Sequence, residues 1–480
     1  MDDDMEFDLD LTDAGKYGFK GLTATVRASD STKYFLDDSL LGPYTRQLPA
    51  QGADLVDIAS AVAWADRRHQ RTRAYGVYGD SLGWMRTFHI KLGVREPDLW
   101  NSPTVKSYLE QYLRWHTEDT WDLQFEQLTG IRRPSDAAVQ TPLFKAPPEN
   151  AAVALFSGGL DSLAGTADML QGNPDRTLFL LSAVHPRLSG VTSHLYKGIC
   201  DRGYKVKYAP YPFHLVNPRA RHSVSPHAKK KEEKSQRTRG FMFMAFAAAT
   251  ALATDATEIA ACETGVGAVN LPVNWAQLGA QTTRAVHPRS LVNMNHLLGL
   301  IGIPGITFTA PYFWNTKAEL CSALANTDLR GLCANTVSCD NFTHRKTNPA
   351  PHHELHCGTC TSCIFRRVAV LASQLAPDDP LHLYETDLWR PLPKAELKPL
   401  EPAKMMNNQV DTILRALASP DPRTSMLVAF PELSGAARAL EEMPGIFGAS
   451  QQGDIVDRLC NLYQRYANEW SACKPTLWPA

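Results

Sequence analysis

The sequence has no long hydrophobic run, no excess of charge of one sign and no apolar leader. No stretch approaches the 18 uninterrupted apolar residues that a membrane-spanning helix needs. Lys and Arg total 49 against 50 for Asp and Glu, so the net charge gives no indication of nucleic-acid binding. The acidic opening MDDDMEFDLD is the reverse of a signal peptide. We therefore expect a cytoplasmic protein that contacts neither membranes nor nucleic acid.

The remaining composition is ordinary for a globular protein, with 44% hydrophobic and 21% charged residues. Ten cysteines are present, and in a cytoplasmic chain they indicate thiols or metal ligands rather than disulfides. At 480 residues the chain is long enough for about three domains.

The N-terminal segment, residues 1–148, predicts an α+β domain. Residues 22–26 and 87–92 alternate like half-buried strands, whereas 54–68 and 102–115 have helical periodicity. Five tryptophans give this segment enough bulk for a core of its own. It carries no catalytic pattern, and we interpret it as an accessory domain that docks a protein partner.

From residue 149 the pattern changes to alternating strands and helices. Strand-like runs recur at 152–156, 177–183, 204–208 and 258–262, with helical stretches between them. This alternation predicts an α/β fold with a doubly wound parallel sheet that binds ligands at the carboxyl ends of its strands. The predicted domains are the α+β domain at 1–148, the α/β domain at 149–380, and a helical C-terminal extension at 381–480 with amphipathic stretches at 406–418 and 451–469.

A glycine pair joins the first strand-like run to a small-residue helix. Such a junction leaves backbone N–H groups aimed at one point, with the positive end of the helix dipole behind them. Gly158 and Gly159 leave room for a ligand against the backbone. The hydroxyls of Ser157 and Ser162 can donate to phosphate oxygens, and Asp161 predicts either a Mg²⁺ contact or a helix N-cap. The six residues of this predicted phosphate loop are Ser157, Gly158, Gly159, Leu160, Asp161 and Ser162.

The pattern S-G-G-x-D-S differs from the Walker motif, because no Gly-Lys-Ser/Thr follows it. It resembles the PP-loop of the ATP pyrophosphatase superfamily. The resemblance implies that the β- and γ-phosphates of ATP are held while a substrate oxygen attacks the α-phosphorus and pyrophosphate leaves. From the residues alone, a glycine turn with a capping Ser and Asp is the alternative.

Other polar residues follow later strands or begin helices, and so are expected over the same cleft. Backbone groups of Ser182 and Ala183, at the end of the second strand-like run, could read the adenine edge. Arg237, before an apolar helix, could reach phosphate or the adenylate, with a structural salt bridge as its alternative. Glu263 and Asn270 are suited to grip an amide-bearing heterocycle.

Four cysteines predict a metal site. Two overlapping C-x-x-C spacings place Cys357, Cys360 and Cys363 around one point, and Cys339 can complete a tetrahedron. Four thiolates favour a structural Zn²⁺ ion, because no position is left open for water. An iron–sulfur cluster is the alternative metal group. Three nearby histidines could substitute for one cysteine, most plausibly Cys339: they are His352, His353 and His356.

Together, the loop at 157–162 and the Cys-Gly-x-Cys-x-x-Cys motif resemble the 7-cyano-7-deazaguanine synthase (QueC) family over residues 151–375. The resemblance implies a PP-loop ATP pyrophosphatase fold with ATP, Mg²⁺ and structural Zn²⁺. Enzymes of that family adenylate 7-carboxy-7-deazaguanine, form an amide with ammonia, and use a second ATP to dehydrate the amide to a nitrile.

The chain departs from that family by its added segments in front and behind, and by a loose match over 236–270. Its outline resembles the enlarged QueC-like proteins of bacterial antiviral operons, of the QatC type or accompanying cyclic-nucleotide signalling systems. That resemblance implies transfer of the adenylated deazaguanine to a protein amine, such as the N-terminus of a protein encoded nearby. The alternatives are an ammonia-dependent nitrile synthase and a nucleotide-sensing subunit without turnover.

Overall fold

The computed structural model describes residues 6–10, 22–27, 33–36, 48–68, 86–129, 148–182, 186–211, 214–216, 233, 235, 237–273, 284–342, 355–390, 400–448 and 453–475.

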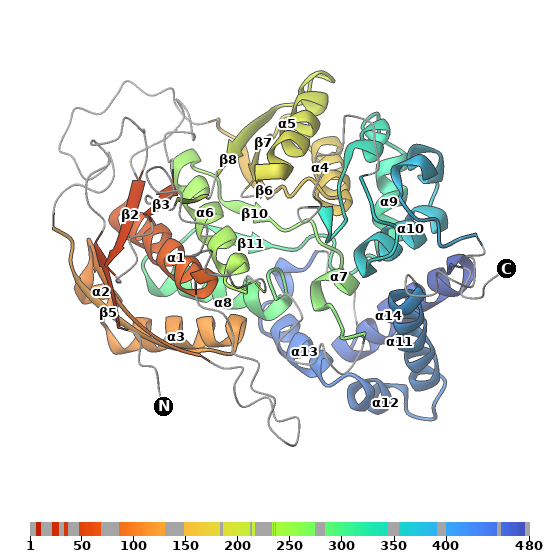
Figure 1. The fold of residues 1–480 in the computed structure, drawn as a ribbon. Coiled ribbons are helices and arrows are strands. Elements are labelled where there is room, and N and C mark those ends of the chain that lie inside the picture. Colours follow the sequence, from red (N-terminus) through yellow and green to blue (C-terminus); the bar gives the residue numbers. More distant parts are fainter. Residues whose placement is uncertain are drawn as a thin grey trace, which may run out of the picture.

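A parallel five-stranded sheet occupies the centre of the molecule (Figure 1). Its order is β11-β10-β6-β7-β8, and every neighbouring pair is parallel. The carboxyl ends of all five strands therefore lie along one edge. The predicted α/β architecture with a parallel sheet is confirmed, and four of the strands were expected from their apolar runs. The strands are β6 (Ala151–Leu155), β7 (Thr177–Ser182), β8 (Val206–Pro210), β10 (Glu258–Ala260) and β11 (Thr307–Thr309).

Helices cover both faces of this sheet, because its strands are apolar on both sides. In β7, Phe179 and Leu181 belong to one hydrophobic core, whereas Leu178 and Leu180 belong to a second core on the opposite face. The first core is closed by α6 (Arg239–Thr254) and α8 (Pro288–Leu300). The second is closed by α4 (Leu160–Gly172), α5 (Pro186–Cys200) and α9 (Lys317–Ala325).

A second, mixed sheet is built mainly by the N-terminal segment, in the order β5-β4-β1-β2-β3-β9. β9 comes from the central part of the chain and pairs antiparallel with β3. The predicted strands at 22–26 and 87–92 and the helices at 54–68 and 102–115 are confirmed. The elements are β1 (Glu6–Asp10), β2 (Leu22–Arg27), β3 (Lys33–Leu36), β4 (Thr87–Val94), β5 (Thr120–Gln127), β9 (His214–Val216), α1 (Ala50–Arg68), α2 (Pro97–Trp100) and α3 (Pro103–Thr117).

The C-terminal part is helical, as the amphipathic patterns predict. One hydrophobic core runs from Leu55 on the first helix, through Val153 in the parallel sheet, to Trp470 near the end of the described chain. The domain boundaries at 148 and 380 stay predictions. The remaining helices are α7 (Gly265–Val269), α10 (Thr361–Ala372), α11 (Glu401–Leu417), α12 (Pro422–Ala429), α13 (Glu432–Glu442), α14 (Ile455–Cys473) and the short 3₁₀ turns η7 (Arg330–Asn335), η9 (Ala376–Asp378), η10 (Leu381–Leu383) and η13 (Pro444–Ile446).

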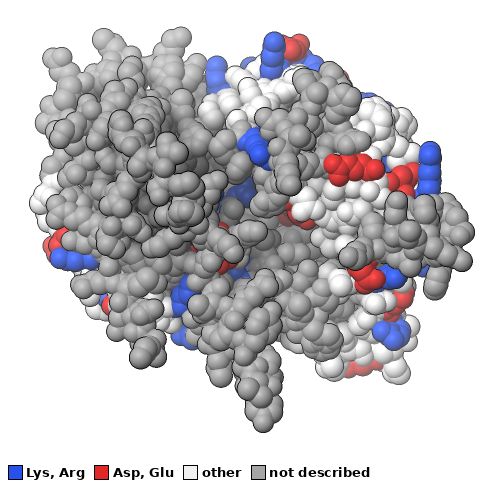
Figure 2. All heavy atoms as spheres, viewed as in Figure 1, with Lys and Arg blue, Asp and Glu red and all other residues white. Residues whose placement is uncertain are grey.

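Within the described ranges, no helix combines the length and apolar composition needed to cross a membrane. Figure 2 shows acidic and basic side chains interspersed over one face of the molecule.

Candidate functional site

The predicted phosphate loop lies between β6 and α4, at the carboxyl edge of the parallel sheet. Gly158 has φ 80°, a left-handed conformation that favours glycine, and an added Cβ would lie 2.9 Å from Cγ2 of Thr192. Gly159 is extended, with φ −82° and ψ 169°, and forms the N-cap of α4. Asp161 is therefore not the N-cap: it lies in the first turn of the helix, where a carboxylate interacts favourably with the helix dipole.

The two serines of the loop face each other. Ser162 Oγ donates to the Gly159 carbonyl at 2.8 Å, and Ser157 Oγ accepts from the Gly159 N–H at 3.3 Å. The two hydroxyl oxygens are 3.5 Å apart, with Ser157 exposed and Ser162 buried. The hydroxyls and the start of the helix therefore converge on one small region.

Lys317 brings a positive charge to this loop from another part of the chain. It is the first residue of α9, and its ammonium group pairs with the Asp161 carboxylate. The side chains are only 7% and 13% exposed, so solvent screens the pair weakly. Burial lowers the pKa of Lys317, but the carboxyl groups of Asp161 and Glu263 outweigh that effect and raise it overall. Lys317 therefore stays protonated.

Sequence reasoning missed Lys317, although a local signal was present. Thr316 and Glu319 form a capping box, in which the Thr316 hydroxyl accepts from the Glu319 N–H and the Glu319 carboxylate accepts from the Thr316 N–H. The T-x-x-E spacing of Thr316 and Glu319 predicts a helix start. It therefore places Lys317 in the first turn of that helix.

Glu263 completes a group of three ionisable side chains at the edge of the sheet. It follows β10, and its carboxylate packs against the Cα of Gly267 in α7. Burial and the nearby Asp161 carboxylate raise the pKa of Glu263 to about 8, against the opposing effect of Lys317. The group thus contains one ion pair and one carboxyl that titrates close to neutral pH.

The raised pKa of Glu263 predicts a pH-dependent stability difference. The folded protein holds a proton that the unfolded chain releases above its pKa of 4.5, so this contribution to stability is fully present below that pH and lost as the pH rises through about 8. Glu263→Gln removes the titrating group, so the free energy of unfolding should fall less steeply with rising pH than in the wild type. The two slopes should differ by up to about 1.4 kcal/mol per pH unit. Urea unfolding at pH 5.5, 7 and 8.5 measures this. The exposed Glu126→Gln is the control, and parallel curves for wild type and Glu263→Gln would contradict the prediction.

Three polar atoms at this edge are buried without a hydrogen-bond partner in the described part of the chain. They are Ser182 Oγ at the end of β7, Asp161 Oδ1 in the first turn of α4, which follows β6, and Thr264 Oγ1 at the N-cap of α7, which follows β10; the three strands are neighbours in the sheet. Unpaired buried polar atoms cost free energy, so a bound ligand or water molecule would stabilise this arrangement.

The structure places three of the other predicted binding residues, Ser182, Asn270 and Arg237. The Ser182 carbonyl accepts from the Tyr211 N–H at 2.8 Å, and Ala183 lies outside the described residues. Asn270 ends α7 in the left-handed conformation that asparagine tolerates, with φ 51°. Arg237 is 5% exposed, with Nη1 3.8 Å from the Glu118 carboxylate. Glu118 is therefore a partner for the structural salt bridge that was the alternative interpretation of Arg237. The contact of Arg237 with nucleotide stays a prediction.

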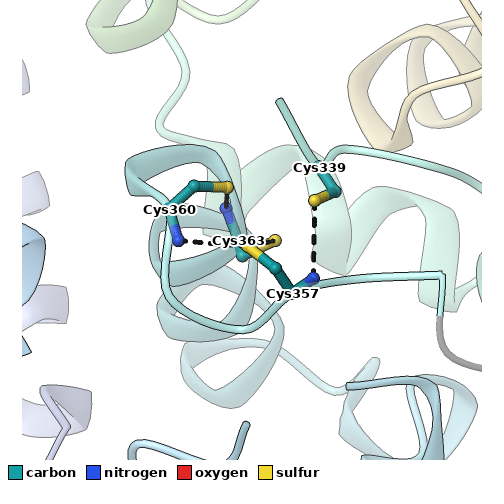
Figure 3. A group of neighbouring side chains, drawn as sticks. All are labelled: Cys339, Cys357, Cys360 and Cys363. Carbon is teal, nitrogen blue, oxygen red and sulfur yellow. Dashed lines mark hydrogen bonds between the residues drawn. The ribbon is translucent and has the colours of Figure 1, made fainter. Parts of the chain in front are cut away.

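The four-cysteine cluster is confirmed (Figure 3). The sulfur atoms of Cys339, Cys357, Cys360 and Cys363 all lie within 4.8 Å of one another. Four sulfurs around a zinc ion at about 2.3 Å would be roughly 3.8 Å apart. The Cys357–Cys363 separation of 3.9 Å fits this value. The cluster can therefore hold a metal ion such as zinc.

Backbone N–H groups and neighbouring thiols stabilise negative charge on part of this cluster: the pKa of Cys357 is lowered, whereas hydrogen bonds with the other thiols raise the pKa of Cys360 and Cys363. Backbone N–H groups donate to the sulfurs of Cys339, Cys357 and Cys360 at 3.3 to 3.4 Å. Cys360 is also the N-cap of α10, where the helix dipole favours negative charge. Hydrogen bonds from the neighbouring thiols, first of all from Cys339, lower the pKa of Cys357. Of the alternative histidine ligands, His356 packs instead against Tyr384, with ring centroids 4.8 Å apart; His352 and His353 lie outside the described residues.

The cysteine cluster is connected to the phosphate loop through the segment that leads to Cys339. Arg366, fully buried on α10, pairs with Asp379 at 2.8 Å and donates to the Thr336 hydroxyl at 2.6 Å. The next residue, Val337, donates its N–H to the Gly158 carbonyl at 2.9 Å. One segment of chain therefore contacts both the loop and the metal site.

No protein-family model matches this chain, and no curated protein has significant similarity to it. Its function is accordingly inferred from the motifs and their geometry.

Proposed function

We propose that the protein is an ATP-dependent ligase that releases AMP and pyrophosphate. Its acid substrate would be 7-carboxy-7-deazaguanine, and its acceptor an amine, such as the N-terminus of a protein in antiviral defence. The observation that carries the proposal is the convergence of Asp161, Glu263 and Lys317 beside the glycine loop at the carboxyl edge of the sheet. The substrate and the biological role rest on the resemblance of the two motifs to the QueC-like proteins.

In this proposal the phosphate loop binds the β- and γ-phosphates through its backbone N–H groups and the hydroxyls of Ser157 and Ser162. Asp161 would hold Mg²⁺ through its unpaired Oδ1 atom, a hard oxygen ligand. The metal ion would neutralise charge on the leaving pyrophosphate. Lys317 supplies a second positive charge to the same region, which compensates for the missing Walker lysine.

The reaction would have two steps. In the first, a carboxylate oxygen of the acid attacks the α-phosphorus, an O–P bond forms, and the bond to pyrophosphate breaks. In the second, the amine attacks the carbonyl carbon, a C–N bond forms and AMP leaves. The proton lost by the amine would go to Glu263 in its deprotonated form, which a pKa of about 8 makes the minor form at neutral pH. Recognition of the heterocycle by Glu263 and Asn270 stays a prediction.

The decisive experiment follows ATP in the presence of 7-carboxy-7-deazaguanine. We expect carboxylate-dependent exchange of labelled pyrophosphate into ATP, and release of AMP when an amine is added. ADP as the product would contradict the proposal. Efficient nitrile formation with ammonia would favour the synthase alternative, and ATP binding without AMP release would favour the sensing subunit. Intact-mass measurement of proteins encoded nearby, incubated with the active mixture, identifies the acceptor by its deazaguanine-sized adduct.

A further inference from the structure

The last described helix, α14, packs against the elements that carry the candidate site. Its apolar face shares a core with the parallel sheet, and Leu462 contacts the first residue of α7. Figure 1 shows α14 passing beside α7 and below α10. The C-terminal part of the chain carries no catalytic motif, so its polar contacts with the site require a separate explanation.

The first of these contacts is made by Glu469. Its carboxylate accepts a hydrogen bond of 2.5 Å from the Thr316 hydroxyl. Thr316 is the N-cap of α9 and directly precedes Lys317. The same hydroxyl accepts from the Glu319 N–H at 3.2 Å, so Glu469 fixes the direction of its proton and leaves its oxygen available for the cap.

Arg465, one turn earlier on α14, holds the other half of the capping box. Its Nε donates to the Glu319 carboxylate at 2.8 Å, and its Nη2 donates to the Trp314 carbonyl at 2.6 Å. Glu319 closes the box through the Thr316 N–H. Arg465 and Glu469 therefore contact the residues on both sides of Lys317.

An aromatic contact completes the connection. Tyr466 of α14 packs edge-on against Phe365 of α10, with centroids 5.7 Å apart and planes at 88°. The ammonium nitrogen of Lys317 lies 5.0 Å from the centroid of the Phe365 ring, within the range of a cation–π contact. The helix thus supports both the backbone at Lys317 and the ring beside its charged end.

We infer that α14 is a positioning element for the Lys317 ammonium group, with Arg465 and Glu469 as its positioning residues. The catalytic consequence rests on the proposed function. The structural consequence does not, because the contacts hold the start of α9 whatever reaction takes place there. Helix ends open more readily than helix centres. The contacts from α14 oppose this opening at the start of α9, where Lys317 lies.

Chemical acetylation of Lys317 tests the structural part without any enzyme assay. The full-length protein is treated with N-hydroxysuccinimide acetate, and Lys317 modification is quantified by peptide mass spectrometry. Glu469→Met, which removes the hydrogen-bond acceptor, and Arg465→Met, which removes the donor, should each accelerate modification about fivefold, the effect of losing one hydrogen bond on a local opening. The control is Asn468→Ala, on the exposed face of the same helix, which should leave the rate at the wild-type value. Equal rates in all four proteins would overturn the inference.

Steady-state kinetics test the catalytic part. In both variants kcat for AMP release should fall about tenfold, with KM for ATP within about twofold of wild type, because a displaced Lys317 weakens stabilisation of the transition state rather than nucleotide binding. Faster acetylation without any AMP release, in wild type or variants, would support α14 as a positioning element and reject the proposed function. Unchanged acetylation with normal AMP release would reject the inference and retain the function. Thermal unfolding identifies a variant that has lost its fold, in which case the other variant decides.

Discussion

Replacing Lys317 with methionine should reduce AMP release by about 100- to 1,000-fold, the effect of removing one preorganised group that stabilises charge in a transition state. The ammonium group is buried beside Asp161, and the carboxyl groups of Asp161 and Glu263 raise its pKa, so it carries its charge into the site. Methionine has a similar length, and its thioether can pack against the Phe365 ring in place of the cation–π contact. Single-turnover measurement of AMP, with saturating ATP and acid, gives the loss in the chemical step.

Two further variants separate chemistry from folding in this experiment. Lys317→Met leaves Asp161 buried without its partner, which is itself destabilising. The double variant Lys317→Met/Asp161→Asn removes the unpaired charge and should recover part of the free energy of unfolding without recovering AMP release. The exposed Lys205→Met should behave as wild type in both measurements. Full activity in the single variant would remove Lys317 from the mechanism.

Replacing Cys357 with serine should abolish metal binding and lower the melting temperature by about 5 to 10 °C, because a structural metal contributes several kcal/mol to folding. Zinc content by plasma mass spectrometry should fall from about one ion per chain to near zero. The affinity for ATP should fall as well, since the segment that ends at Cys339 donates a hydrogen bond to the Gly158 carbonyl. Calorimetric titration with ATP measures that effect.

The matched control is Cys473→Ser, a partly buried cysteine outside the cluster. It should retain the metal, the melting temperature and the affinity for ATP. A Cys357→Ser protein with no metal but unchanged ATP affinity would show that the contact between Val337 and Gly158 does not couple the two sites. If the purified protein contains iron and absorbs visible light, the cluster holds an iron–sulfur group rather than zinc.

Sequence reasoning succeeded where the signal is local. Four of the five strands of the parallel sheet were predicted from strand-like runs, and three of the four clustered cysteines lie within seven positions, so both signals come from short stretches. The left-handed Gly158 follows from a strand-to-helix junction in the same way. Each of these features depends on residues that are neighbours in the chain.

It could not identify or choose between partners that are distant in sequence. Lys317 meets Asp161 across 156 positions, and although the T-x-x-E spacing predicts the helix start at Lys317, no local pattern indicates that its side chain reaches Asp161. Arg237 has Glu118 of another segment as its neighbour, which the sequence could not distinguish from a phosphate. Two short strands, β1 and β9, join segments far apart in the chain, and such pairing is set by the tertiary fold rather than by propensity.

The apolar interior that reaches from Leu55 to Trp470 is shared by the first, middle and last parts of the described chain. Cutting the chain before the parallel sheet or after it would expose apolar surface to water on the piece that remains. Truncated forms should therefore be harder to keep in solution than the full-length protein.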